Sequence, residues 1–224
     1  MNVLSSFRTI WEGLDWSVLT GALFSVIPAL LCITFHELSH GFVAYKLGDR
    51  TAKDAGRLTL NPIKHIDVFG LLMMVVFGFG WAKPVPVNMN NFKNPKSGMA
   101  ITALAGPVSN MLLAAVMLIV ALFLYPHTGG DVVYWIFRLV IQTAWLSIAL
   151  GIFNIVPIPP LDGSKVLFSF LSDDMYNKLM RYERYGMLIL LMVIWTGVLG
   201  TPLSTATETV FYWMWDGLGA LFGR

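Results

Sequence analysis

The feature of this sequence that most constrains the fold is a run without a charged residue from Ser17 to Phe35. A helix needs about 20 mostly apolar residues to cross the hydrocarbon core of a bilayer, and this run is close to that length. No small-residue cleavage site follows it, so we expect an uncleaved spanning helix rather than a signal peptide. We expect this helix to cover about residues 16–47, with Gly48 at its C-terminal end.

The composition also indicates a membrane protein. Of the 224 residues, 56% are hydrophobic and 12% are charged, and the mean hydropathy is +0.68. A soluble domain carries about 25% charged residues. The net charge of +2 is too small to indicate a nucleic-acid partner, and the single cysteine excludes an intrachain disulfide. We therefore expect one membrane-embedded domain over residues 1–224, all-α and polytopic, with the lipid bilayer as its surroundings.

Three later apolar segments predict further spans, giving about four transmembrane helices in all: residues 98–125, 132–156 and 185–199. Residues 68–80 are apolar but short, so we expect a re-entrant segment there, followed by an extended, β-like edge over residues 81–97. Residues 1–16 and 204–224 carry tryptophans among polar residues, which predicts interfacial helices at both ends.

The distribution of lysine and arginine predicts the orientation of the chain. Residues 46–97 and 157–184 are rich in both, whereas the turn at 126–131 contains neither. The positive-inside rule places the two basic regions in the cytosol. We therefore expect a multi-pass protein of the cell (plasma or inner) membrane, with both ends of the chain outside.

The first predicted span carries the sequence His-Glu-Leu-Ser-His at residues 36–40. On a helix, His36 and His40 project from one face and can bind one Zn²⁺ between them, with Glu37 beside them as general base. The helix continues for roughly 9 Å from His40 to Lys46, so the motif lies below the membrane surface on the cytosolic side. Ionisable groups at that depth are costly and indicate function.

A zinc hydrolase usually has three protein ligands and one open position. Asp162 is the strongest candidate for the third ligand, because it lies in a proline-broken stretch at the cytosolic end of the third predicted span. The alternatives are Asp173 and Asp174, which lie in a polar segment, and His65, which follows a basic stretch.

Three motifs together resemble the site-2 protease family of intramembrane zinc metalloproteases, in its short prokaryotic form without PDZ or CBS domains. They are HELSH at 36–40, AGPVSN at 105–110 and NIVPIPPLDG at 154–163. The resemblance covers roughly residues 30–170 and implies that zinc is bound by His36, His40 and Asp162.

The same resemblance implies a mechanism. Glu37 takes a proton from a water acidified by zinc and passes it to the leaving amine. Asn154 is expected near the scissile carbonyl, and Asn154 or His65 helps to stabilise the oxyanion. The implied substrate is a transmembrane protein, hydrolysed in or near its membrane helix after local unwinding, which is regulated intramembrane proteolysis. The unwound segment can add as a strand along residues 84–90. The sequence carries no indication of the oligomeric state.

Two other functional classes would use the same residues. A membrane metal transporter would use the histidines as transit ligands, but it would repeat His, Asp or Glu along several spans, and this sequence has one such cluster. A non-catalytic scaffold that binds helices would not need the complete set of motifs.

Overall fold

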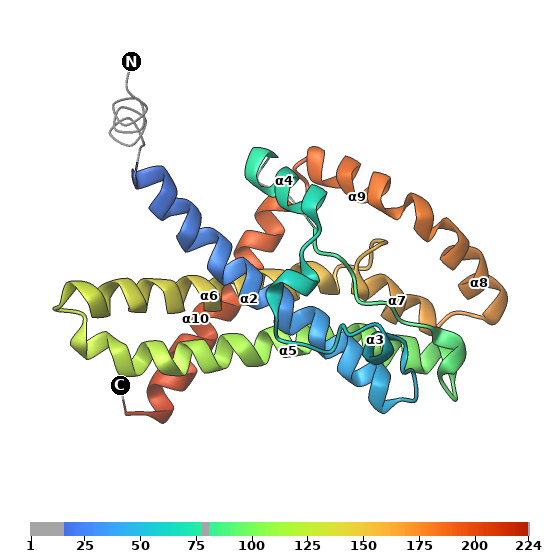
Figure 1. Ribbon diagram of the computed structural model, residues 1–224, viewed down its shortest axis with the longest axis horizontal. Helices are drawn as coiled ribbons and strands as arrows, with labels where there is room; N and C mark the ends of the chain where they lie inside the picture. The colour runs from blue at the N-terminus through green and yellow to red at the C-terminus, as the bar shows by residue number, and fades with distance from the viewer. Residues whose placement is uncertain (1–15, 78–80, 224) are drawn as a thin grey trace, which may run out of the picture.

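The computed structural model describes residues 16–77 and 81–223, which are mostly helical (Figure 1). The long helices are α2 (Trp16–Lys46), α5 (Pro95–Leu124), α6 (Asp131–Ile155) and α10 (Gly200–Leu221). The shorter ones are α3 (Thr51–Asp54), α4 (Val68–Phe77), α7 (Asp162–Ser169), α8 (Asp173–Tyr182) and α9 (Gly186–Trp195). Single 3-10 turns are η1 (Pro62–His65), η2 (Met89–Asn91), η3 (Tyr125–His127) and η4 (Glu183–Tyr185). The interfacial helix predicted for residues 1–16 lies, except for Trp16, outside the described residues.

Three helical stretches are long and apolar enough to cross a membrane: Phe24–Lys46 in α2, Pro95–His127 over α5 and η3, and Asp131–Ile155, which is α6. They coincide with the first three predicted spans, and the all-α, polytopic architecture is confirmed. Helices α5 and α6 run side by side as a hairpin that turns at η3, and α2 packs against both (Figure 1).

The hairpin is stabilised by a core in which small side chains let the helices approach one another. Ala114 and Leu118 of α5 and Ala144 and Ile148 of α6 are fully buried, and Phe211 of α10 packs against them. Because lipid tails are as apolar as leucine, close packing rather than removal from water stabilises such contacts. Helix α10, predicted from its aromatic residues, is therefore also part of the packed bundle.

The predicted span at residues 185–199 takes a different form. Helix α9 has 10 residues, and at ~15 Å it is too short to cross a bilayer. The chain then bends sharply, with Gly197 at a φ of +70° between α9 and α10. A left-handed glycine is a common way to end a helix. The described residues thus contain three spans, or four if the bent pair crosses as one.

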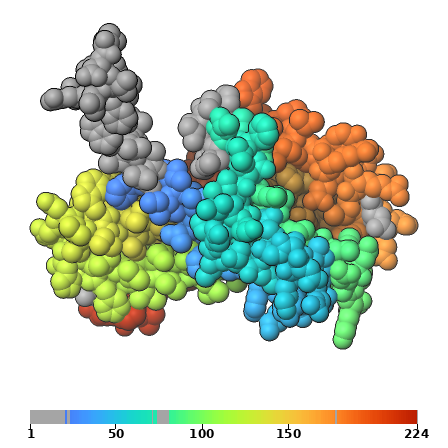
Figure 2. Space-filling model, viewed as in Figure 1, coloured from blue at the N-terminus to red at the C-terminus, as the bar shows by residue number. Residues whose placement is uncertain are grey.

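The connection between α2 and α5 covers the middle of one face of the molecule (Figure 2). Within it, α4 has 10 residues, too few to cross the bilayer, as a re-entrant segment requires. The described residues contain no strand, and the predicted β-like edge is limited to one antiparallel bridge between Ile66 and Ala82. Pro84 and Pro86 lack the N–H groups that a longer ladder would need.

The packing of the hairpin core leads to a prediction about the stability of the protein. Leu118→Ala removes a fully buried side chain and leaves a cavity, so we expect a loss of about 2–5 kcal/mol in the free energy of unfolding in detergent. Leu112→Ala is the matched control on the same helix, because the Leu112 side chain is 64% exposed and detergent can fill the space. Equal losses in the two variants would contradict the packing of α5 described above.

Candidate metal centre

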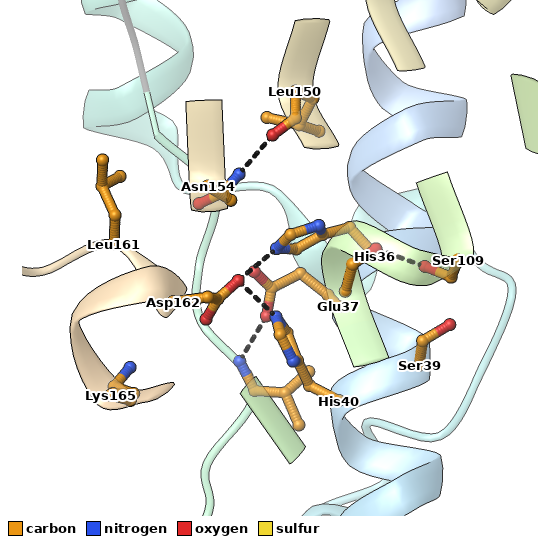
Figure 3. A network of polar contacts seen from close by, with 12 residues as sticks. His36, Glu37, Ser39, His40, Ser109, Leu150, Asn154, Leu161, Asp162 and Lys165 are labelled. Atoms are coloured by element: carbon orange, nitrogen blue, oxygen red, sulfur yellow. Dashed lines mark hydrogen bonds and ion pairs between the residues drawn. The ribbon is translucent and has the colours of Figure 1, made fainter. Parts of the chain in front are cut away.

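The two histidines of the motif lie one above the other on the second half of α2. Both are buried, and their ring centroids are 4.5 Å apart. Their closeness follows from helix geometry, because residues four apart lie on one face. The Nε2 atoms of His36 and His40 point to the same side of the helix (Figure 3).

Asp162 completes the cluster from a distant part of the chain. Helix α6 ends at Ile155, and the proline-rich stretch that follows turns the chain back, so that α7 begins at Asp162. The Oδ2 atom of Asp162 lies 3.1 Å from Nε2 of His36 and 3.2 Å from Nε2 of His40 (Figure 3). The aspartate that the sequence favoured is therefore the one that meets the histidines.

A glycine after the aspartate makes this turn possible. A Cβ atom at Gly163 would collide with the carbonyl group of Ile155, at the end of α6. Only a residue without a side chain allows the first turn of α7 to pass so close to the backbone of α6. The Asp-Gly pair is thus a geometric unit, in which Gly163 permits the approach that brings in Asp162.

A second glycine, Gly106 of α5, lies against the histidine rings. A Cβ atom there would lie 2.5 Å from Cε1 of His36 and 2.5 Å from Nε2 of His40. The backbone of α5 therefore forms one wall of the site. The groups that pack against Gly106 are the two imidazole rings.

The backbone of α5 also fixes the protonation of His40. Nδ1 of His40 lies 2.7 Å from the carbonyl oxygen of Thr102, which can only accept a hydrogen bond. Nδ1 must therefore carry a proton, and in the neutral imidazole the lone pair is then on Nε2, the atom that faces Asp162. A ring nitrogen held in this way by a second hydrogen bond is a typical arrangement in metal-binding histidines.

The three donor atoms fit a zinc ion. One ligand atom from each of His36, His40 and Asp162 lies within 4.8 Å of the others, and this is the one such cluster among the described residues. The Asp162 Oδ2 atom is buried, yet no described residue donates a hydrogen bond of regular geometry to it. Lone pairs that face one another repel unless a cation lies between them. Two ligands of a tetrahedral Zn²⁺ lie about 3.3 Å apart, close to the separations found here.

Glu37 lies beside this cluster without belonging to it (Figure 3). Its Oε2 atom accepts a hydrogen bond of 2.8 Å from the backbone N–H of Val85. The predicted edge at residues 84–90 thus reaches the site, but the N–H of Val85 binds the glutamate. No pattern of side chains in the sequence indicated this contact, because its donor is a backbone group.

Asn154 lies near the cluster, on the last turn of α6 (Figure 3). Its Nδ2 atom donates a hydrogen bond of 2.9 Å to the carbonyl oxygen of Leu150. The side chain is therefore held along its own helix in this structure. The role predicted for it beside the substrate stays a prediction.

His65 lies apart from the three donors. It is fully buried, and its Nε2 atom donates a hydrogen bond of 2.9 Å to the carbonyl oxygen of Thr59. It lines a cavity of about 50 Å³ together with Thr34 and Trp81. Its predicted help to the oxyanion also stays a prediction.

The two other aspartates considered as ligands lie at the surface. Asp173 is 84% exposed and forms an ion pair of 2.9 Å with Lys96. Asp174 is exposed as well and lines a separate cleft at the start of α8. The structure therefore brings only Asp162, among the acidic candidates, to the histidines.

Comparison with known proteins agrees with these observations. The model of peptidase family M50 matches residues 24–196. "Putative zinc metalloprotease YwhC" of Bacillus subtilis is 40% identical over 204 residues, which cover 87% of this chain and 85% of the relative. "Putative zinc metalloprotease Rip2" of Mycolicibacterium smegmatis is 26% identical over 196 residues, covering 85% and 72%. "Zinc metalloprotease MJ0392" of Methanocaldococcus jannaschii is 29% identical over 161 residues, covering 72% and 36%. No solved structure matches this chain.

The matched region begins within α2 and ends just after α9, so it contains the whole cluster and Glu37. It covers most of the chain, and the relative from Bacillus subtilis is similar over nearly its full length. The chain therefore belongs to peptidase family M50, the site-2 proteases, and is a zinc-dependent metalloprotease.

Proposed function

We propose that this protease hydrolyses a peptide bond in or near a transmembrane helix of a membrane-protein substrate, as in regulated intramembrane proteolysis. The observation that carries the proposal is the place of the cluster. His36 and His40 belong to the stretch Phe24–Lys46, which is apolar enough to span a bilayer. A site built into such a helix is accessible to a substrate that itself lies in the membrane.

In this proposal, His36, His40 and Asp162 hold the zinc ion. When bound, zinc supplies Lewis acidity, which lowers the pKa of water toward ~7 and polarises the scissile carbonyl. Glu37 accepts the proton of the attacking water and delivers it to the leaving amine. The hydrogen bond from Val85 orients the Glu37 carboxylate for this task.

The same proposal gives the substrate an extended path to the metal. A cleft of about 420 Å³ is lined by Val85 and Val87 on one side and by Thr102 and Asp162 on another. An unwound substrate segment placed there would lie beside the backbone of residues 85–89 and could pair with it as an added strand. Asn154, in the last turn of α6, is the proposed donor to the scissile carbonyl.

The orientation of the protein in the membrane and its organisation as a single domain are also proposals. Basic residues lie at the ends of α2 and α5 nearest the cluster and in the connection between these helices; they include Lys46, Lys96 and Arg57. This distribution supports a site toward the cytosolic side of the cell membrane. The packing of α10 on the hairpin supports one membrane-embedded domain that includes the C-terminal helix.

The proposed roles of the ligands and the base can be separated by experiment. We expect about one zinc per purified wild-type chain, and a loss of more than about tenfold in zinc affinity for Asp162→Ala, because one of three ligands is removed. Glu37→Gln should retain zinc but slow cleavage by about 10²–10⁴-fold, because only the proton acceptor is lost. Asp173→Ala, at the exposed ion pair, is the control and should change neither quantity.

The assay uses proteoliposomes that contain the protease and a panel of single-span membrane proteins, with cleavage sites mapped by mass spectrometry. Cuts within or beside the spans, absent from Glu37→Gln, are the expected result. Cleavage of soluble proteins alone would contradict the intramembrane substrate. Intact biological activity in Glu37→Gln, lost in His36→Ala, would favour a metal transporter.

The wall formed by Gly106 gives a prediction that concerns zinc alone. Gly106→Ala should weaken zinc binding by at least tenfold, because the added methyl group displaces both imidazoles. The change would otherwise favour the helix, by about 1 kcal/mol of propensity. Gly217→Ala on α10 is the matched control, since its Cβ meets no atom within 4 Å. Competition with a chelator measures the zinc affinity of both variants. Similar affinities in Gly106→Ala and Gly217→Ala would contradict the close approach of α5 to the histidines.

The proposed pairing of the substrate can be tested at Val87, away from the contact of Val85 with Glu37. Val87→Pro removes one backbone donor from the wall of the cleft, and we expect cleavage to fall at least tenfold while zinc stays bound. Val87→Ala keeps the donor and should cleave at nearly the wild-type rate. Full activity in Val87→Pro would exclude pairing at this residue.

A further inference from the structure

The hydrogen bond that orients Glu37 comes from a segment that no sheet supports. Residues 83–88, called here the Val85 segment, carry the N–H that lies 2.8 Å from Oε2 of Glu37. The described residues form no strand with it. A site of this kind works only when its groups are held within about 0.5 Å. Something other than β-pairing must therefore fix this backbone.

At its C-terminal side, the Val85 segment is held by Asp49. This residue follows the end of α2, the helix that carries Glu37, and it is 0% exposed. Its Oδ2 atom accepts a hydrogen bond of 2.7 Å from the backbone N–H of Asn88. Its Oδ1 atom accepts from the side-chain amide of Asn91 at 2.7 Å and from the backbone N–H of Thr51 at 3.1 Å.

These contacts keep Asp49 ionised. Burial would raise the pKa of this carboxyl, but the hydrogen bonds from Thr51, Asn91 and Asn88 outweigh it and hold the pKa below its usual range. A depressed pKa means that the carboxylate contributes stability above the unfolded-state pKa and loses it as the pH falls through the folded-state pKa. At neutral pH the charged, acceptor-only form is therefore present.

At its N-terminal side, the Val85 segment is held by Arg57. This side chain is buried, and its Nη2 atom donates a hydrogen bond of 2.6 Å to the carbonyl oxygen of Lys83. The N–H of Lys83 in turn donates to the carbonyl oxygen of His65 at 2.9 Å. The backbone is thus fixed two residues before Val85 and three residues after it.

We propose that Asp49 and Arg57 are positioning residues for catalysis, which clamp the two ends of the Val85 segment so that the Val85 N–H orients Glu37. Both act through the backbone and neither belongs to the metal cluster. This inference rests on the proposed role of Glu37 as general base. Each of the two buried charged side chains places one hydrogen bond on the backbone of this segment, Asp49 at Asn88 and Arg57 at Lys83.

The chemistry of the two side chains suggests substitutions that change their hydrogen bonds. Asp49→Asn is nearly isosteric, but it replaces one acceptor oxygen by an NH₂ group, which must then face the N–H of Asn88 or the donors of Thr51 and Asn91. Arg57→Gln removes the charge and shortens the side chain, so that its amide no longer reaches the carbonyl oxygen of Lys83, whereas Arg57→Lys keeps a charged donor on a longer side chain. Asp54→Asn is the matched control, because the Asp54 side chain is 64% exposed and forms an ion pair with Arg50.

The first measurement is hydrogen–deuterium exchange of the full-length protein in proteoliposomes. We expect Asp49→Asn and Arg57→Gln to raise the exchange rate over the Val85 segment at least tenfold, while α2 stays protected and zinc per chain is unchanged. Arg57→Lys should restore most of the protection. Unchanged exchange over the Val85 segment in both variants would overturn the proposal that Asp49 and Arg57 hold this segment in place.

The second measurement is a double-mutant cycle on kcat, with the substrate used for Glu37→Gln. Asp49→Asn and Arg57→Gln should each lower kcat by about 10–100-fold in the wild-type background. In the Glu37→Gln background it should have almost no effect, because the group that it orients is already inactive. Equal losses in both backgrounds would show a merely structural role and overturn the inference.

The two proposals fail in different ways. If Glu37→Gln itself cleaves normally, the proposed function and the positioning role both fall. If Glu37→Gln is inactive but Asp49→Asn and Arg57→Gln cleave at the wild-type rate, only the positioning role is refuted. If Asp49→Asn does not assemble, the comparison of Arg57→Gln with Arg57→Lys decides the same question.

Discussion

Two imidazole nitrogens and a carboxylate oxygen point their lone pairs at one another inside a helical membrane protein, at separations of 3.1 and 3.2 Å. Each group is costly to bury without a partner, and together they repel unless a cation joins them. Several features of the chain allow these three side chains to come together. Gly106 lets α5 approach the rings, Gly163 lets α7 approach α6, and the carbonyl of Thr102 leaves the Nε2 lone pair of His40 free. The fold is therefore organised to bring a few polar atoms together within an apolar bundle.

Much of this arrangement could be predicted from the sequence. The spacing of His36 and His40 fixes their common face on any helix, and the long uncharged run before them identifies that helix as a span. Asp162 could be predicted because prolines must break α6 just before it. These residues carry their information locally, in spacing, charge or a break in the helix, so that a single sequence is enough to read them.

Contacts made by the backbone could not be predicted in the same way. The sequence predicts an extended edge over residues 81–97, but the N–H of Val85 binds Glu37, and Asp49 and Arg57 bind the backbone on either side of Val85. Every buried N–H needs an acceptor, yet the sequence does not say which acceptor will be near. The bend between α9 and α10 was missed for a related reason. The apolar residues Val198 and Leu199 lie beyond the end of α9, and the sequence does not show that the backbone turns at Gly197 before them.

The distance in sequence between the metal ligands has a consequence for biogenesis. His36 and His40 are synthesised long before Asp162, so α2 must enter the bilayer while two of its polar groups still lack their third partner. Helix α5 follows next, and the carbonyl of Thr102 satisfies one ring nitrogen of His40. The cluster closes only when the chain after α6 folds back. A growing chain thus gains helices α2, α5 and α6 first, and the three metal-binding side chains come together only afterwards.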